Sequence, residues 1–307
     1  MREGILRDTS PFAKIMFSAF IVLSSFLITL FAGLFLAIPV FGMGFMELIE
    51  SLSNITHPGY ANLLKYFQAV QSVGLFVIPP LVLGWFFGGN SIKYLRLHKK
   101  TRWITILLTT VIMISAIPLI NLMAHLNAQI SLPEFMSSIE EWIKQTEDAA
   151  RHLTEKFLAA ETPYDLLLNV FIIAVIPAIG EELLFRGVIQ RLFSEWTRNP
   201  HAGIWITAVI FSAMHLQFYG FIPRTMLGVL FGYMLVWTGN MWIPITAHFV
   251  NNAMAVMVFY FIQRKQLGEE METIGSEPAD WIYITLSLIF FLFFITIFYA
   301  RAKRPVR

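Results

Sequence analysis

The feature that most constrains this chain is a series of long apolar runs separated by short polar segments. A membrane-spanning helix needs about 20 consecutive, mostly apolar residues, and eight segments approach that length. They lie at about residues 15–38, 64–87, 103–125, 166–180, 202–217, 224–238, 241–262 and 281–300. The fourth and sixth are short or interrupted by polar residues. The sequence therefore predicts an all-α, polytopic helical membrane protein with about eight transmembrane helices.

The composition supports a membrane protein and excludes several kinds of site. Hydrophobic residues make up 57% of the 307 positions, and the mean hydropathy of +0.66 is far from that of ordinary globular proteins. Cysteine is absent, which excludes disulfides, a thiolate nucleophile and cysteine-ligated metals. The net charge of +2 decides little, whereas the position of the charges along the chain is informative.

The charged residues between the apolar runs predict how the chain crosses the membrane. The segment from Lys93 to Arg102 holds five basic residues and no acid, and more basic residues follow Ala300. Cytoplasmic loops carry an excess of lysine and arginine, so both segments should be cytoplasmic. The stretch from Leu126 to Asp165 holds eight acids against three bases and should lie outside. These constraints place the N- and C-termini of a multi-pass protein in the cytoplasm.

The external stretch contains one periodic segment. Phe135, Ile139, Trp142 and Ile143 recur at helical spacing with acids between them, which predicts an amphipathic helix along the outer surface. Such a helix can simply cover the bundle, or it can act as a lid or substrate gate.

The domain organisation is simple. No internal repeat and no Ser/Gly-rich linker divides the chain, so residues 1–307 are interpreted as a single membrane domain. Its candidate functional core lies at about residues 165–260, and the external acidic loop, which is partly amphipathic, lies at about residues 126–165. The first apolar run is too long for a signal-peptide core and lacks a small-x-small cleavage pattern after it.

The most informative segment runs from Pro177 to Arg186 and reads Pro-Ala-Ile-Gly-Glu-Glu-Leu-Leu-Phe-Arg. Charges at bilayer depth are costly, so they usually face a water-filled cavity or a partner. Glu182 and Arg186 are spaced i, i+4 and can form an ion pair, while Glu181 points elsewhere and stays free. Pro177 lacks the N–H that would bond to Ile173 and tends to kink the helix. Taken alone, the segment can also be an ion-paired helix end at the cytoplasmic interface.

Two later apolar segments carry histidines. Phe211-Ser-Ala-Met-His215 places a histidine about 18 Å from the predicted cytoplasmic end of its helix, at about 1.5 Å per residue. His248-Phe-Val-Asn-Asn252 sets an imidazole and an amide on one helix face, with Asn251 rotated away. A lone buried histidine is usually structural, and polar residues often join membrane helices. Neither segment is diagnostic alone.

Together, these residues have the composition of a hydrolytic site. A packed bundle has no stability reason to gather a free carboxylate, two histidines and an amide at similar depth. Amide hydrolysis needs a base for water, a donor to the leaving nitrogen and donors to the oxyanion, and these side chains can supply all three. Two histidines and a glutamate can also bind zinc. The His-Glu-x-x-His, Gly-x-Gly-Asp and Gly-x-Ser-Gly signatures of other intramembrane proteases are missing.

At these residues the sequence resembles the CPBP family, which contains the CAAX prenyl proteases and the bacteriocin-processing, Abi-type enzymes. The family pattern is Glu-Glu-x-x-x-Arg, then Phe-x-x-x-His, then His-x-x-x-Asn, and it is found here at residues 181–186, 211–215 and 248–252. The resemblance covers about residues 165–260. The first three predicted helices match only by being apolar.

The resemblance implies an intramembrane, glutamate-dependent endopeptidase that cuts a peptide bond of a membrane-associated protein or peptide with an activated water. Carried over residue by residue, Glu181 would be the general base, and His215 would assist the water. His248 and Asn252 would stabilise the oxyanion. The predicted catalytic residues are thus Glu181, His215, His248 and Asn252, and the predicted supporting residues are Glu182 and Arg186. They should surround one cavity that opens toward the cytoplasmic side.

Three other interpretations stay open. The same residues permit a zinc-dependent protease, but an asparagine one turn from His248 is a poor zinc ligand and a good oxyanion donor, so we predict no metal and no cofactor. A non-proteolytic membrane adaptor or immunity-type homologue would keep the same fold. A proton-coupled transporter also explains buried Glu and His, although no matching broken helices are visible. The expected partners are a protein or peptide substrate and the lipid bilayer, and no nucleic acid.

Overall fold

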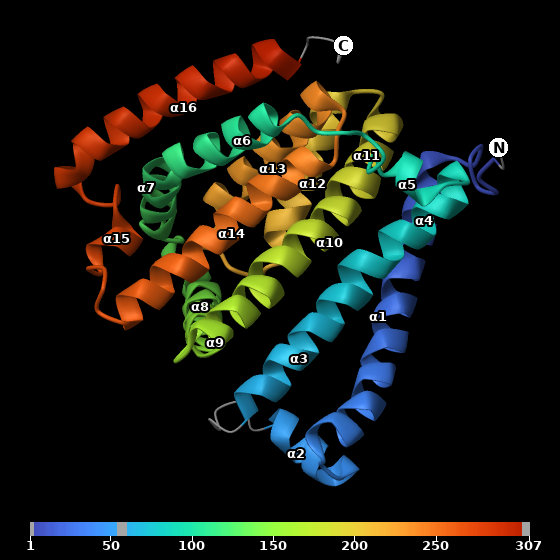
Figure 1. Cartoon of the computed structure of the whole chain (residues 1–307), viewed down its shortest axis with the longest axis horizontal. Helices are drawn as coiled ribbons and strands as arrows, with labels where there is room; N and C mark the ends of the chain where they lie inside the picture. The colour runs from blue at the N-terminus through green and yellow to red at the C-terminus, as the bar shows by residue number, and fades with distance from the viewer. Residues whose placement is uncertain (1–2, 54–59, 303–307) are drawn as a thin grey trace.

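The computed structural model describes residues 3–53 and 60–302, which form a bundle of helices (Figure 1). Within these ranges no strand forms, and six continuous helices are long and apolar enough to cross a membrane. They are α1 (Pro11–Phe41), Ala61–Gly88, Pro163–Thr197, α13 (Phe221–Thr238), α14 (Trp242–Gln263) and α16 (Trp281–Ala302). The predicted all-α, polytopic membrane fold is confirmed.

Two further predicted spans depart from a straight transmembrane helix. α6 (Trp103–Ser115) and α7 (Ile117–Ala128) form a pair bent by 42°, which brings the number of candidate spans to seven if the pair counts as one. α12 (Pro200–Ala213) is apolar but has only 14 residues. The expected number of about eight is therefore approximate, because α12 is shorter than a full span.

Two of the long helices are composites. Ala61–Gly88 consists of α3 (Ala61–Ser72), η2 (Val73–Val77) and α4 (Ile78–Gly88). Pro163–Thr197 consists of α9 (Pro163–Asn169), η4 (Val170–Val175), α10 (Ile176–Leu184), η5 (Phe185–Ile189) and α11 (Gln190–Thr197). The wider π-helical turns η2 and η4 come directly before prolines, which lack an N–H and collide with the carbonyl four residues earlier in a regular α-helix. The π turns thus keep both helices continuous.

The two composite helices touch at Gly180. A Cβ there would lie 2.8 Å from the Cβ of Phe76 and 3.0 Å from Cγ2 of Val77. Contacts this short are essentially excluded, so a side chain at Gly180 would force the helices apart. The glycine therefore brings η2 against α10, directly beside Glu181.

The chain alternates between two ends of the bundle. The basic end carries α5 (Ser91–Tyr94), the loop that follows it, and the α11–α12 and α13–α14 junctions. The acidic end carries α2 (Phe45–Ser53), η3 (Glu134–Met136), α8 (Ser137–Leu158), residues 214–220, α15 (Glu270–Thr273) and η6 (Pro278–Asp280). Both termini of the described chain lie at the basic end: Lys14 Nζ is 3.7 Å from Glu195 Oε2 of α11, and Arg301 lines a pocket with Lys99. That this end is cytoplasmic stays a prediction.

The predicted amphipathic helix of the acidic loop is α8, which confirms the periodicity argument. Its apolar positions do not simply cover the bundle, however. Phe135 just before it, Ile139 and Trp142 expose 85%, 47% and 55% of their surface. Thr154 and Leu158, near the end of the helix, instead line an internal cavity. The helix thus combines an exposed apolar edge with an end whose side chains contribute to the wall of the cavity.

Candidate active site

The polar residues of the three sequence motifs meet inside the bundle. Glu181 lies on α10, His248 and Asn252 lie on α14, and His215 follows the end of α12. All four side chains line one cavity of about 490 Å³. The structure therefore brings together all the residues that the sequence predicts as catalytic, although they come from α10, from α14 and from the segment that follows α12.

Glu182 is completely buried and connects two of the motifs. Its Oε1 lies 3.0 Å from Nη1 of Arg186, as the i, i+4 spacing predicts. The same oxygen accepts a 2.8 Å hydrogen bond from Nδ1 of His248. Because Nδ1 is the donor, a neutral His248 presents an unprotonated Nε2 on the other side of its ring. Glu182 thus sets both the position and the tautomer of His248.

Arg186 is buried as well, and its environment partly replaces the lost water, because Nε and Nη1 have no hydrogen-bond partner among the described residues. Its Nη2 donates a 3.2 Å hydrogen bond to the carbonyl of Gly228 on α13. The guanidinium lies 4.7 Å from the ring centre of Phe211 and 5.5 Å from that of Phe231. Cation–π contacts of this kind gain strength when the cation is desolvated. The Glu182–Arg186 pair therefore forms a rigid base beneath the cavity.

His248 is held between the two carboxylates. Its Nε2 lies 3.8 Å from Oε2 of Glu181. The ring stacks on Phe231 with centroids 5.6 Å apart and meets Phe211 edge-on at 6.1 Å. Whereas Glu182 has no exposed surface, the Glu181 side chain keeps 12% of its surface exposed. Glu181 is consequently the carboxylate that water in the cavity can reach.

Asn252 occupies a position that Pro177 creates. In a regular helix the N–H of residue 177 would bond to the carbonyl of Ile173, but proline has no N–H. Nδ2 of Asn252 donates a 3.1 Å hydrogen bond to that carbonyl instead. The amide therefore joins α14 to η4 and leaves its second N–H for another acceptor.

His215 stands at the end of α12, where the chain leaves the helix. Its Nδ1 lies 2.9 Å from the carbonyl of Phe211, one turn earlier. An Nδ1–H donated to this carbonyl leaves Nε2 free as an acceptor. The helix ends at Ala213, four residues before the predicted boundary at residue 217. As a result, His215 belongs to an irregular segment and not to the interior of a span.

Side chains from neighbouring helices hold this irregular segment in place. Asn127 of α7 is buried and bonds twice: Nδ2 donates to the carbonyl of Phe218 at 2.8 Å, and Oδ1 accepts from the N–H of Ile222 at 2.7 Å. Glu147 of α8 accepts a 2.8 Å hydrogen bond from the N–H of Tyr219. The position of His215 thus depends on helices outside the three motifs.

Two cavity residues were missed by the sequence analysis. Asn251, predicted to point away, lines the cavity and donates a 3.1 Å hydrogen bond from Nδ2 to Oδ1 of Asn252. Arg224 of α13 also lines the cavity and donates to Gln217 Oε1 at 2.8 Å. Both residues could have been predicted from the sequence. Asn251 is spaced i, i+3 from His248, and Arg224 is a charge within an apolar helix.

The cavity opens on the side opposite to the one predicted. Thr154 and Leu158 of α8 and Gly220 of the α12–α13 segment contribute to its wall, and all three lie at the acidic end. The prediction of an opening toward the basic, cytoplasmic side was wrong because it placed Glu181 at the end of a helix over residues 166–180. The helix continues to Thr197, so Glu181 lies near its middle.

The site does not present a ready-made metal centre. Among residues 3–53 and 60–302, no group of three or more His, Asp or Glu side chains is placed to hold a metal ion. Oε1 of Glu182 is engaged by Arg186 and by Nδ1 of His248, and Oε2 has no hydrogen-bond partner. Glu181 and Nε2 of His248 are the pair of possible metal ligands that lie beside each other. A catalytic zinc site normally has three protein ligands.

Comparison with known proteins finds a family model that matches the segment in which the three motifs lie. Residues 163–254 match the family model described as type II CAAX prenyl endopeptidase Rce1-like, and the resemblance inferred from the motifs is thereby confirmed over this segment. The uncharacterized protein YpbD of Bacillus subtilis (strain 168) is 32% identical over 111 residues, which cover 34% of this chain and 54% of that protein.

The putative membrane peptidase YdiL of the same organism is 30% identical over 91 residues, 30% of this chain and 37% of that protein. The chain thus spans about half the length, or less, of these curated relatives. No solved structure matches the chain.

Proposed function

From the match of residues 163–254 to the Rce1-like CAAX endopeptidases, we propose that this integral, multi-pass membrane protein is an intramembrane endopeptidase that hydrolyses a peptide bond with activated water. The observation that carries the proposal is the shared cavity: an accessible carboxylate, Glu181, faces an imidazole, His248, that a second carboxylate holds in place.

In the proposed reaction, Glu181 accepts a proton from a water molecule in the cavity while the water oxygen adds to the carbonyl carbon of the substrate. His215 assists by accepting a hydrogen bond from the same water through its free Nε2. When the C–N bond breaks, the proton held by Glu181 passes to the leaving nitrogen. General acid–base catalysis by one positioned carboxyl group typically contributes roughly 10²- to 10⁴-fold.

The oxyanion of the tetrahedral intermediate would be stabilised by His248 and Asn252. His248 donates from Nε2 only when both ring nitrogens carry protons, because Nδ1 already donates to Glu182. With His248 protonated, the charges of Glu181, Glu182, Arg186 and His248 sum to zero, so the buried cluster is balanced. The second N–H of Asn252 is the other donor. Glu182 and Arg186 act as positioning residues.

The chemistry of the cavity wall indicates a peptide substrate that enters from the acidic end. Apolar side chains such as Leu227 and Phe231 alternate there with amides. A mostly apolar wall with a few convergent polar groups is typical of binding sites for peptides and small ligands. The scissile bond must be in an extended or unwound segment, because a helical carbonyl is already hydrogen-bonded.

The test is a comparison of cleaved peptides in membranes that contain the wild-type protein or the Glu181→Gln variant. We expect a set of new peptide termini that is present with wild type and absent with Glu181→Gln. The matched control is Glu269→Gln, an exposed glutamate outside the cavity, which should leave all these termini in place. Identical termini in wild type and Glu181→Gln would favour a non-proteolytic homologue that keeps the fold.

A further inference from the structure

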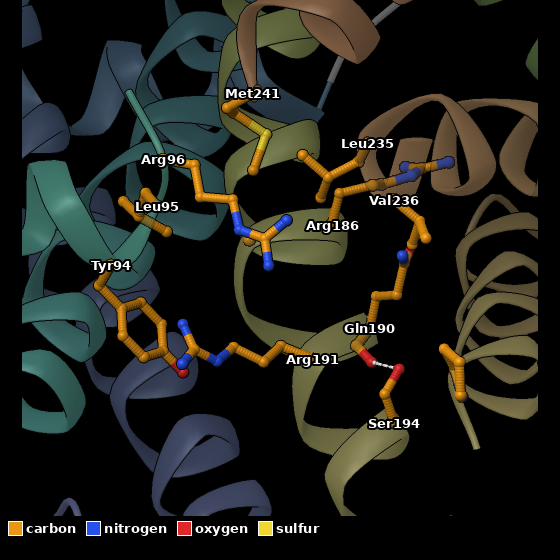
Figure 2. Close-up of a pocket in the computed structure, with 12 residues that line it drawn as sticks. Tyr94, Leu95, Arg96, Arg186, Gln190, Arg191, Ser194, Leu235, Val236 and Met241 are labelled. Atoms are coloured by element: carbon orange, nitrogen blue, oxygen red, sulfur yellow. Dashed lines mark hydrogen bonds between the residues drawn. The ribbon is translucent and has the colours of Figure 1, made fainter. Parts of the chain in front are cut away.

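A second pocket lies at the basic end of the bundle, away from the peptidase cavity. It has a volume of about 270 Å³ and is enclosed by the loop after α5, by η5 and α11, and by the α13–α14 junction (Figure 2). Arg186 contributes only its stem to the wall, and Figure 2 shows its guanidinium pointing away from the pocket. The two sites share no lining residue.

Two other arginines line this pocket. Arg96 extends from the loop toward the middle of the pocket (Figure 2), and no described residue forms a hydrogen bond or ion pair with its side chain. Arg191 of α11 lies 4.2 Å from the ring centre of Tyr94. Its Nε bonds to Glu195 at 3.2 Å, while its terminal nitrogens have no partner among the described residues. Both arginines thus keep unused donors at one pocket.

A third cation, Lys99, lies near Arg96. Gly239 ends α13 in the left-handed conformation, with φ of 60°. A Cβ there would lie 2.9 Å from Nζ of Lys99 and 3.8 Å from Nη1 of Arg96, so both cations approach the same turn. Partial removal from water and, secondarily, the charge of Arg191 lower the pKa of Arg96. Glu195 pairs with Arg191, so three cations face one acid here, and the excess positive charge favours a bound anion.

Other residues at this end of the bundle also favour binding of an oxyanion. One can donate a hydrogen bond to it, and tryptophans nearby indicate the depth of the lipid headgroups. Burial raises the pKa of Tyr94 to about 12, so its phenol stays neutral and can donate a hydrogen bond. Nε1 of Trp242 donates to the carbonyl of Leu97 at 3.0 Å, and Trp103 is 73% exposed at the start of α6. Tryptophans of this kind are enriched in the headgroup layer.

We propose that this pocket binds a phosphate group, carried by an anionic membrane lipid, between the guanidinium groups of Arg96 and Arg191 with Lys99 near Arg96. The planar guanidinium fork matches phosphate oxygens in pairs, and such charge-assisted bonds are about twice as strong as neutral ones. Free phosphate offers the same chemistry, and the depth of the pocket beside the tryptophans favours the lipid. This inference does not depend on the peptidase activity.

The experiment titrates purified, detergent-solubilised protein with short-chain phosphatidylglycerol and follows the thermal unfolding midpoint. We expect saturable stabilisation of wild type and an apparent affinity that is at least about 10-fold weaker in Arg96→Gln and in Arg191→Gln, since each loses charged hydrogen bonds. Arg198→Gln is the matched control, because it removes the same charge from an exposed position at the same end outside the pocket. It should bind as wild type does.

Two further measurements complete the experiment. The first compares inorganic phosphate with the lipid as the source of the phosphate group, and the second checks that the variants are folded. Inorganic phosphate that stabilises wild type as strongly as the lipid does, and competes with it, would support a phosphate site filled from solution. Without lipid, all variants should unfold close to the wild-type midpoint, because neither arginine is fully buried and the glutamine keeps much of the side-chain stem. Equal weakening by Arg198→Gln, or wild-type binding by the Arg96→Gln/Arg191→Gln double variant, would overturn the proposal.

Discussion

The helix Pro163–Thr197 and the helix α16 are both apolar and both long enough to cross a membrane, yet they differ in what their residues contact. In Pro163–Thr197, 44% of the most apolar window is buried inside the protein, against 11% in α16. The first helix carries Glu181, Glu182 and Arg186, and it contains two π-helical turns. No acidic or basic side chain lies in α16 before Arg301.

The difference shows where this fold depends on particular side chains. In α16 most apolar residues face outward, where lipid solvates them as well as protein does, so one apolar residue can replace another. In Pro163–Thr197 each polar group needs a partner, because water is absent. The partners come from α12, α13 and α14, so this helix fixes the positions of three others. Substitutions in Pro163–Thr197 should therefore affect catalysis or strongly reduce stability, whereas substitutions in α16 should have small effects on stability.

The largest expected effect is on catalysis and not on folding. Glu181→Gln keeps the size and hydrogen-bonding ability of the side chain but removes the base, so the cleavage rate should fall roughly 10²- to 10⁴-fold. The thermal unfolding midpoint should stay close to that of wild type, because Glu181 forms no buried hydrogen bond in the structure. Reconstituted protein, a peptide identified from the membrane comparison and a calorimetric scan supply both measurements. A variant that cleaves as fast as wild type would exclude Glu181 as the base.

The next effect is on stability. Arg186→Ala leaves the charge of Glu182 buried without its partner, which typically costs roughly 3 to 5 kcal/mol. Folded yield and the unfolding midpoint in detergent should both fall. The control is Phe293→Ala in α16, which removes a large side chain that is 58% exposed and should cost much less. If both variants lost the same stability, the distinction between the two helices would fail.

A smaller and more specific effect concerns the bond between α14 and η4. Asn252→Ala removes the side-chain donor to the carbonyl of Ile173, at a cost of roughly 1 to 3 kcal/mol. Pro177→Ala restores a backbone N–H near that carbonyl. In the Pro177→Ala background, Asn252→Ala should therefore cost about 1 kcal/mol less than in wild type.

Denaturant or thermal unfolding of the two single variants and the double variant measures this coupling. Asn251→Ala is the control for the cycle, because its amide bonds to Asn252 and not to the backbone. Additive effects of Pro177→Ala and Asn252→Ala, within about 0.3 kcal/mol, would mean that the amide does not replace the missing N–H.

The sequence predicted local relations well and relations between helices only by analogy. The 3.0 Å pair of Glu182 and Arg186 follows from i, i+4 spacing alone. The bond from His248 to Glu182 joins residues 66 positions apart, and helix geometry carries no information about it. That the motifs share one cavity was inferred from chemistry and family resemblance, because no periodicity brings α10, α12 and α14 together.

The errors have a common physical cause. Helix ends depend on which residues can continue the hydrogen-bond ladder, and hydropathy does not report this. Residues 190–197 are amphipathic, so they fall outside an apolar window although they continue the helix. Placing the end of that helix near residue 180 moved Glu181 to a membrane surface and reversed the predicted opening. The depth of a polar residue is therefore less certain from sequence than its helix face.

The smallest expected effect is that of removing metal. In a zinc peptidase the metal activates the water, and three protein ligands normally hold it at about 2.0 to 2.2 Å. Here Glu182 is bonded to Arg186 and to Nδ1 of His248, so His248 offers zinc only Nε2, beside Glu181. Asn252 already donates to a carbonyl, as expected of an amide that serves as a donor. We therefore predict that chelator treatment leaves the cleavage rate of reconstituted protein within about two-fold of the untreated rate, whereas Glu181→Gln lowers it roughly 10²- to 10⁴-fold. Elemental analysis of the same samples is the control for residual metal. Stoichiometric zinc whose removal abolishes cleavage, and whose return restores it, would replace the carboxylate mechanism with a metal-dependent one at the same residues.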